Sequence, residues 1–293
     1  MKSMDWCRHC GELREMTKEH IPPRGAGNKE PITIFADDAD GVLQVIRTCQ
    51  EGHTVPTLCE ECNHGATRRN LPQAYQRWRQ DTINYLALLG HKVHKETGLD
   101  PNAIFEWIGD DGAYMLPPME HGGALGSDLV HLHPGRISRQ VLGMMLAVQA
   151  DRHLIDNVPT LAQAYFSDDP ASIDGYSLHV AIANAGLAYF SAGALAVTVD
   201  LGGKSPARPT RFWAIASPPF LLMLAEGQDA WQDAPVQATR IDQWLTYPRN
   251  GIFNATDRRV AYPIADRREL LVAKIYQDIH GLPPDPARAV YGE

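Results

Sequence analysis

The sequence predicts an α+β protein, and two observations carry this prediction. Two Cys-x2-Cys pairs in the first 62 residues indicate a small metal-bound unit. Further along, helical periodicity gives way to several apolar, strand-like runs and then to a closing helix, an order typical of α+β domains. At 293 residues, the chain exceeds the usual size of one domain. We therefore expect two domains, residues 1–97 and 128–293, joined by a Gly- and Pro-rich linker at 98–127.

The expected elements follow from periodicity and turn residues. In the first domain they are a short β-hairpin arm at 11–21, a loop-rich insertion at 26–52 with a strand at 43–48, a short helix after residue 62 and a helix at 73–96. In the second domain they are helices at 137–154, 161–166 and 267–279, and strands at 176–185, 194–201, 210–216 and 220–225.

Residues 180–199 carry no charge and are long enough to be considered as a membrane span. They are rich in Ala and Gly, however, and include the polar residues Asn184 and Ser191. Two buried strands joined at 191–193 explain this composition better, so we expect no membrane partner.

The charge pattern limits how the chain can meet nucleic acid. The net charge is −8, which argues against coating nucleic acid through bulk positive charge. The first 100 residues hold 13 Lys/Arg and 14 Asp/Glu and are nearly neutral, so any contact should be a local patch there. Arg68 and Arg69 are the candidates, and a solvated helix face is an equally good explanation of them.

The four paired cysteines, Cys7, Cys10, Cys59 and Cys62, predict one structural zinc site. Four thiolates complete a zinc tetrahedron and leave no open position for chemistry. The fifth cysteine, Cys49, makes the count odd, which fits a reducing compartment better than a disulfide framework. Because the N-terminus also lacks an apolar signal core, we expect a cytoplasmic protein. His9 and His64, beside these cysteines, are expected at the solvated surface.

Three residues could carry phosphodiester hydrolysis. His20 can take a proton from water, and Glu19 directly precedes it. Asn63 follows the last paired cysteine, and its amide oxygen suits Mg²⁺ or Mn²⁺. The alternatives are a surface Glu-His pair at the end of an arm and, for Asn63, a helix N-cap.

The pattern C-x2-C-x8-E-H-I-P-P followed by C-x2-C-N resembles the zinc-bearing HNH endonucleases, which have a ββα-metal core, over about the first 75 residues. The resemblance implies that His20 is the general base and that Glu19 and Asn63 bind one catalytic cation, Mg²⁺ or Mn²⁺. The family often has an Asn shortly before the third cysteine to brace the loop of the base. Here that region offers His53 and Thr54 instead.

These observations lead us to expect a metal-dependent DNA endonuclease, with a C-terminal α+β domain that recognises something or forms a homodimer. In bacteria, fusions of this architecture suggest antiphage defence or restriction. A non-catalytic zinc module that binds nucleic acid or protein is the alternative from another class. A nuclease fold that has lost its activity is a third, because the bracing Asn is missing.

Overall fold

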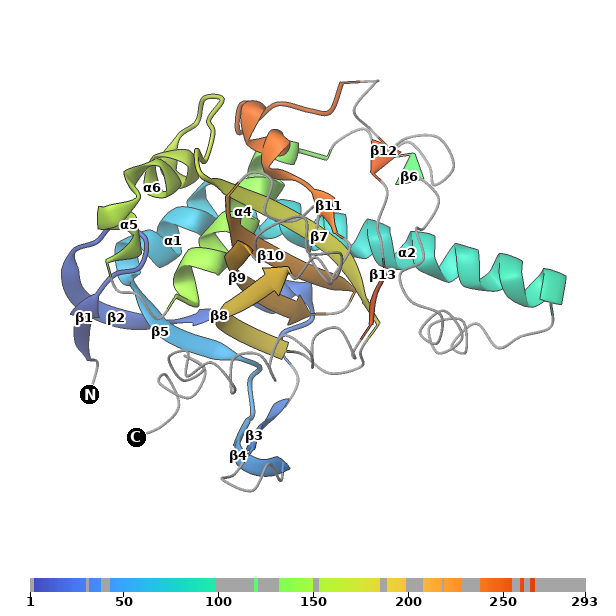
Figure 1. Cartoon of the computed structure of the whole chain (residues 1–293), viewed down its shortest axis with the longest axis horizontal. Coiled ribbons are helices and arrows are strands. Elements are labelled where there is room, and N and C mark those ends of the chain that lie inside the picture. The colour runs from blue at the N-terminus through green and yellow to red at the C-terminus, as the bar shows by residue number, and fades with distance from the viewer. Residues whose placement is uncertain are drawn as a thin grey trace.

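The computed structural model describes residues 3–29, 32–37, 43–97, 119–120, 132–149, 153–184, 189–198, 208–217, 219–227, 238–254, 259–260 and 264–266. The described chain is α+β and contains helices and mainly antiparallel sheets. Figure 1 shows the N-terminal strands on one side of a large sheet, and the long helix α2 (Leu71–Thr97) extending past the opposite side.

A three-stranded sheet and a short helix form the N-terminal part, which we call the knuckle unit. The strand order is β1 (Met4–Trp6), β2 (Leu13–His20) and β5 (Thr54–Cys59), and α1 (Glu60–Arg68) follows β5 directly. Both pairings are antiparallel. The expected hairpin at 11–21 is therefore wrong: this segment is a single strand, β2. It pairs with β1 across the turn that contains Cys7, Cys10 and Gly11, and with the distant strand β5.

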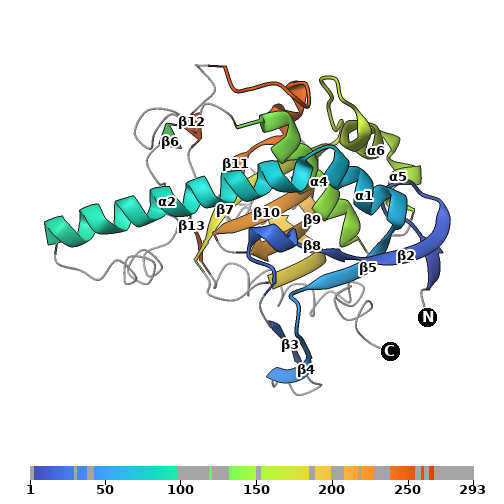
Figure 2. The same ribbon diagram turned by 180° about the vertical axis from the view of Figure 1, so that it is seen from behind.

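The expected insertion contains more regular structure than its loop-rich composition indicated. It begins with the short helix η1 (Arg24–Ala26), and β3 (Ile32–Asp37) then pairs antiparallel with β4 (Leu43–Cys49). The strand expected at 43–48 is confirmed as β4. This hairpin points away from the rest of the described chain in Figures 1 and 2.

The helices of the second half lie close to the expected positions, with one difference. They are α4 (Pro134–Ala147), α5 (Leu154–Asn157) and α6 (Pro159–Phe166). The continuous helix expected at 137–154 ends at Ala147 instead, and Leu154 begins a separate helix, α5.

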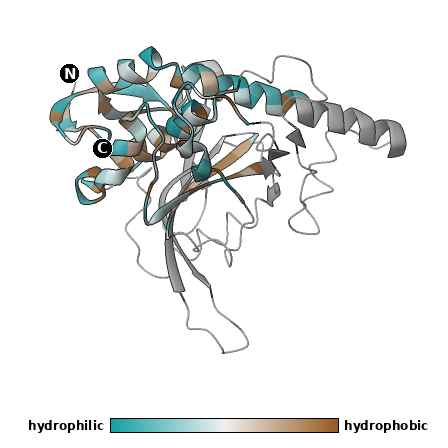
Figure 3. Cartoon of the chain, turned by 90° about the horizontal axis from the view of Figure 1, so that it is seen from above, coloured by the Kyte–Doolittle hydropathy of each residue, from teal (hydrophilic) through white to brown (hydrophobic). Residues whose placement is uncertain are grey.

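The large sheet has the order β11–β7–β10–β9–β8, with β13 (Ile264–Asp266) also paired to β7. Its strands are β7 (Tyr176–Asn184), β8 (Tyr189–Thr198), β9 (Arg208–Ser217), β10 (Phe220–Glu226) and β11 (Thr239–Arg240). The coloured strand segments of this sheet are largely hydrophobic in Figure 3, and β10 is buried over all of its length except Glu226. A separate two-stranded pair joins β6 (Met119–Glu120) to β12 (Arg259–Val260).

The described residues of the uncharged stretch at 180–199 belong to strands β7 and β8, as expected. The expected junction at 191–193 is wrong, since β7 ends at Asn184 and β8 begins at Tyr189. Residues 191–194 instead contain a register shift in the pairing of β8 with β9. Among the described residues, no helix is long and apolar enough to cross a membrane.

The buried side chains form one hydrophobic cluster that runs from Cys7 to Phe253. An aromatic group links α2 to the second half: Trp78 stacks on Phe220 of β10 at 4.0 Å between ring centroids and meets Trp244 of η3 (Asp242–Thr246) at 5.4 Å. The division into 1–97 and 128–293 stays a prediction, but the hydrophobic core extends across it. Except for β6, the linker at 98–127 lies outside the described residues, as does the helix expected at 267–279.

Candidate metal centre and catalytic site

The four paired cysteines converge in the knuckle unit. Cys7 and Cys10 lie in the turn between β1 and β2, Cys59 ends β5, and Cys62 lies in the first turn of α1. Their four sulfur atoms all lie within 4.8 Å of one another. Zinc–sulfur bonds of about 2.3 Å in a tetrahedron place the sulfurs about 3.8 Å apart, so the cluster fits a zinc ion after a small contraction.

The electrostatics of the cluster favour a bound cation. Hydrogen bonds from the Cys62 thiol and from the Cys59 N–H lower the pKa of Cys7, which favours its thiolate. Burial raises the pKa of Cys10 to about 12, so the thiols of an empty cluster resist ionising together. A zinc ion removes this conflict because it binds thiolates and offsets their charge.

Three buried side chains of the knuckle unit donate hydrogen bonds to carbonyl oxygens of α4 or the residues after it. His9 Nε2 donates to Gly143 O at 2.9 Å, Thr57 Oγ1 to Ala147 O at 2.7 Å, and Arg8 Nε to Gln149 O at 3.0 Å. Of the three carbonyls, Ala147 O belongs to the last turn of α4, where carbonyls lack an N–H partner within the helix, so Thr57 satisfies one of them. The metal centre is thereby tied to the second half of the chain.

We expected His9, which lies beside the zinc ligands, at the solvated surface. This expectation is wrong. His9 is 2% exposed, and its ring packs on Tyr165 at 4.3 Å between centroids. Burial lowers the pKa of His9 to about 4, so the ring is neutral at pH 7. His64, by contrast, is exposed as expected and forms an ion-pair contact with Glu60.

His20 and Glu19 lie at the end of β2, beside a register shift in the pairing with β5. His20 Nε2 is 3.0 Å from Glu51 O. Because a carbonyl can only accept, Nε2 is the donor in this hydrogen bond, and Nδ1 is the acceptor nitrogen of the neutral form of the ring. Burial raises the pKa of the half-buried Glu19 carboxyl from 4.5 to about 7.

The segment that bears His20 is held by Asn28, a residue that sequence reasoning missed. Asn28 is 3% exposed, and its Nδ2 donates to Pro22 O at 2.7 Å and to His53 O at 2.8 Å. Its Oδ1 accepts from the His53 N–H at 2.6 Å. Gly52, at φ +85°, lets the chain turn around this amide, since a Cβ there would lie 2.3 Å from Asn28 Oδ1.

The two residues proposed as a loop brace lie beside this contact. His53 is buried, and its Nδ1 donates to Ile21 O at 3.2 Å. Thr54 is half-buried and pairs with His20 in the β2–β5 register. Only the spacing of Asn28 after the Pro22-Pro23 pair hinted at its position, because its partners are backbone groups up to 25 residues away.

Asn63 lies on α1 with its amide against β2. Its Nδ2 is 3.1 Å from Thr17 Oγ1 and 3.2 Å from Lys18 O, directly before Glu19 in the chain. The residue is the fourth of its helix, so the N-cap alternative is wrong: Cys59 occupies that position. Asn63 and Glu19 thus belong to neighbouring elements at the same end of β2.

The two candidate phosphate contacts differ. Arg68 is exposed. Arg69 is half-buried and turned inward: Nη1 donates to Tyr165 O at 2.8 Å, and the guanidinium carbon lies 4.5 Å from the centroid of the Tyr165 ring. Arg68 is therefore the better placed of the two for a phosphate.

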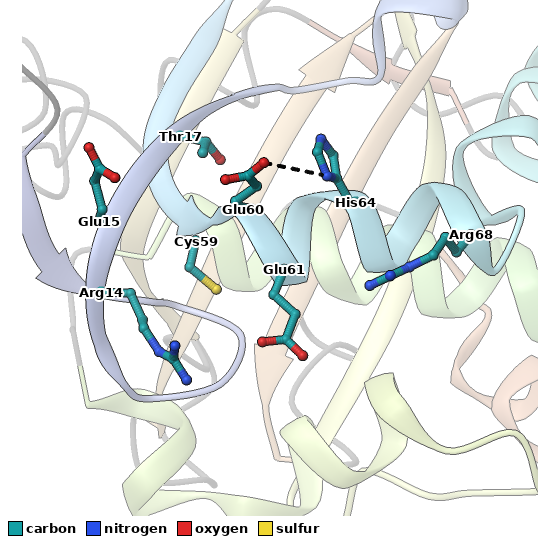
Figure 4. Close-up of a pocket in the computed structure, with 8 residues that line it drawn as sticks. All are labelled: Arg14, Glu15, Thr17, Cys59, Glu60, Glu61, His64 and Arg68. Carbon is teal, nitrogen blue, oxygen red and sulfur yellow. Dashed lines mark ion pairs between the residues drawn. The ribbon is translucent and has the colours of Figure 1, made fainter.

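Two open grooves border the metal centre. The first, of about 560 Å³, lies along α1 and contains Glu60, Glu61, His64 and Arg68 opposite Arg14 and Glu15 of β2 (Figure 4). The second, of about 580 Å³, lies between α1 and the end of α6. Neither groove is lined by Glu19 or His20.

Comparisons with known proteins give no match, either to a family model, to a curated protein or to a solved structure. The resemblance to HNH endonucleases therefore rests on the sequence motifs alone.

Proposed function

We propose that the chain is a metal-dependent endonuclease of the HNH type that hydrolyses phosphodiester bonds of DNA. The observation that supports this best is the hydrogen bond between His20 Nε2 and Glu51 O. Donation of Nε2–H to Glu51 O leaves Nδ1 as the proton acceptor, which is the state a general base needs. Asn28 fixes the turn that carries this carbonyl, and so supplies a brace that the motif itself lacks.

In this proposal Glu19 and Asn63 hold a divalent cation, Mg²⁺ or Mn²⁺, which offsets negative charge on the phosphate. Burial raises the pKa of Glu19 to about 7, and a cation bound to the carboxylate would lower this pKa. His20 accepts the proton of the attacking water, and the four cysteines hold the zinc that fixes the knuckle unit. The zinc takes no part in the chemistry because its four thiolates complete the coordination.

The proposed partners are DNA and a second copy of the chain. DNA meets the knuckle unit through a local patch that includes Arg68. Two copies associate through the second half of the chain, so that two active sites can cut both strands. A role in antiphage defence or restriction follows from the architecture alone.

The test uses supercoiled plasmid and full-length protein of known zinc content. We expect nicking with Mg²⁺ or Mn²⁺ and none when these ions are left out. Glu19→Gln and Asn63→Ala should raise the Mg²⁺ concentration needed for half-maximal rate, because each removes one ligand. Absence of nicking under all ionic conditions, with zinc bound, would contradict the proposal.

One observation favours a second candidate function, a non-catalytic zinc module that binds nucleic acid or protein. Both grooves adjoin the cysteine cluster and not His20. This candidate predicts that DNA or protein binding persists in His20→Ala and that no divalent ion other than zinc is needed.

A further inference from the structure

The groove between α1 and α6 brings together residues from four distant segments of the chain. We call it the arginine groove, because four of its lining residues are arginines: Arg14, Arg68, Arg69 and Arg249. They come from β2, from α1 and from the segment after η3. Such convergence in a groove of about 580 Å³ is typical of a site for an anionic ligand.

One wall of the arginine groove is an exposed aromatic ring. Phe166, at the end of α6, is 42% exposed. Its ring is held edge-on against Tyr165 at 4.9 Å between centroids, and the Arg69 guanidinium lies 5.2 Å from its centroid. The ring is thus fixed in place while much of its surface faces solvent, which is the property of a stacking platform for a planar aromatic group.

Positive charge is crowded at the Phe166 end. Arg139, which is buried, and Arg136 lie close enough to Arg249 that its charge contributes to lowering the pKa of both. Burial is the larger cause in each case. Asp168 pairs with Arg249 and offsets part of this charge.

Two guanidinium N–H groups of the groove wall also lack an acceptor among the described residues. They are Arg69 Nη2 and Arg249 Nε, both buried. A buried donor without an acceptor is costly, so an oxyanion that reached these groups after a small side-chain rotation would be stabilised. Glu12 and Glu61 also line the groove, and Glu12 pairs with Arg14.

We propose that the arginine groove binds a nucleotide, with the base stacked on Phe166 and the phosphate bound by Arg249, Arg69 and Arg68. The ligand is a free nucleotide or a nucleotide of an unpaired strand, and the two share this chemistry. The inference goes beyond the proposed cleavage, because neither His20 nor Glu19 lines the groove.

The experiment is calorimetric titration of full-length His20→Ala, so that the result does not depend on cleavage. The probes are dAMP, deoxyadenosine, inorganic phosphate and a short single-stranded oligodeoxyadenylate. We expect saturable binding of dAMP that is at least about tenfold tighter than that of either fragment, since base and phosphate each contribute. If only the oligonucleotide binds, the nucleotide belongs to a strand and the proposal still stands.

Substitutions then assign the binding to the groove. Phe166→Leu should weaken dAMP binding about 5- to 100-fold through loss of stacking, and Arg249→Gln about 10-fold or more. The matched controls are Trp6→Leu, another exposed aromatic, and Arg77→Ala, an exposed arginine of α2. Both should leave the affinity within about twofold, and zinc content and circular dichroism verify folding.

The proposal is overturned if neither dAMP nor the oligonucleotide binds up to about 5 mM, where even a millimolar site would fill. It is equally overturned if binding is unchanged in both Phe166→Leu and Arg249→Gln. A wild-type protein that fails to nick plasmid but binds dAMP would remove the cleavage proposal and leave this one intact.

Discussion

The contact between the knuckle unit and α4 can be tested with one isosteric change, Thr57→Val. Thr57 is 4% exposed, and its hydroxyl donates a hydrogen bond to Ala147 O at 2.7 Å. Valine keeps the shape but leaves a carbonyl of the last turn of α4 buried without a donor. Such a loss costs about 1–3 kcal/mol, which lowers the melting temperature by about 2–4 °C for each kcal/mol in a chain of this size.

Urea unfolding followed by tryptophan fluorescence is the assay. Trp78 and Trp244 are buried where α2 contacts β10 and η3, and the assay uses a Trp6→Phe background because Trp6 lies in the knuckle unit. If the metal centre and the second half unfold together, Thr57→Val shifts the midpoint of this tryptophan signal. Thr67→Val, an exposed threonine of α1, is the control and should change stability by less than about 0.5 kcal/mol. A tryptophan transition unchanged by Thr57→Val, or two separate transitions, would refute the coupling.

Four further predictions follow from the described contacts. Wild-type protein should contain about one zinc by elemental analysis, and Cys59→Ser should lose it together with the fold of the knuckle unit; zinc loss without unfolding would contradict a structural site. Asn28→Leu should destabilise the protein by about 3–5 kcal/mol in urea melts, because three buried backbone groups lose their partner; a cost below about 1 kcal/mol would show that the amide is dispensable. Gly143→Ala should lower the melting temperature, since its Cβ would lie 2.5 Å from Tyr165 Cε2; a rise would mean that Tyr165 moves freely. The folded state raises the pKa of Glu19 from 4.5 to about 7, so it holds a proton that the unfolded state releases, and stability should fall as pH rises across that interval. Glu19→Gln should flatten that part of the pH profile, and an unchanged slope would contradict the assigned pKa.

The sequence was sufficient for the parts of the fold that are set by local patterns. Apolar periodicity located α2 and α6, and β-branched and aromatic runs located β7, β9 and β10 within a few residues. It failed where tertiary contacts decide. The partner of the second half of β2 is β5, about 40 residues away, and the last carbonyl of α4, at Ala147, is bonded by Thr57, 90 residues away.

The candidate site likewise contains some residues that the sequence predicted and others that only the structure shows. Cysteine spacing alone predicted the cluster of four sulfurs, because Cys-x2-Cys is a local geometric requirement. Asn28 and His9 could not be recognised, since their partners are backbone carbonyls and N–H groups far along the chain. The inward turn of Arg69 depends on Tyr165, 96 residues away, and so is equally invisible in the sequence.

The central claim is that His20 is the general base of a nuclease, and the most direct measurement is the single-turnover rate of plasmid nicking. Wild type, His20→Ala and His64→Ala are compared at equal zinc content, His64 being an exposed histidine of the same knuckle unit. We predict that His20→Ala slows nicking by about 10²- to 10⁴-fold and that His64→Ala keeps the wild-type rate. A His20→Ala rate within about tenfold of wild type would contradict the assignment of His20 as the base.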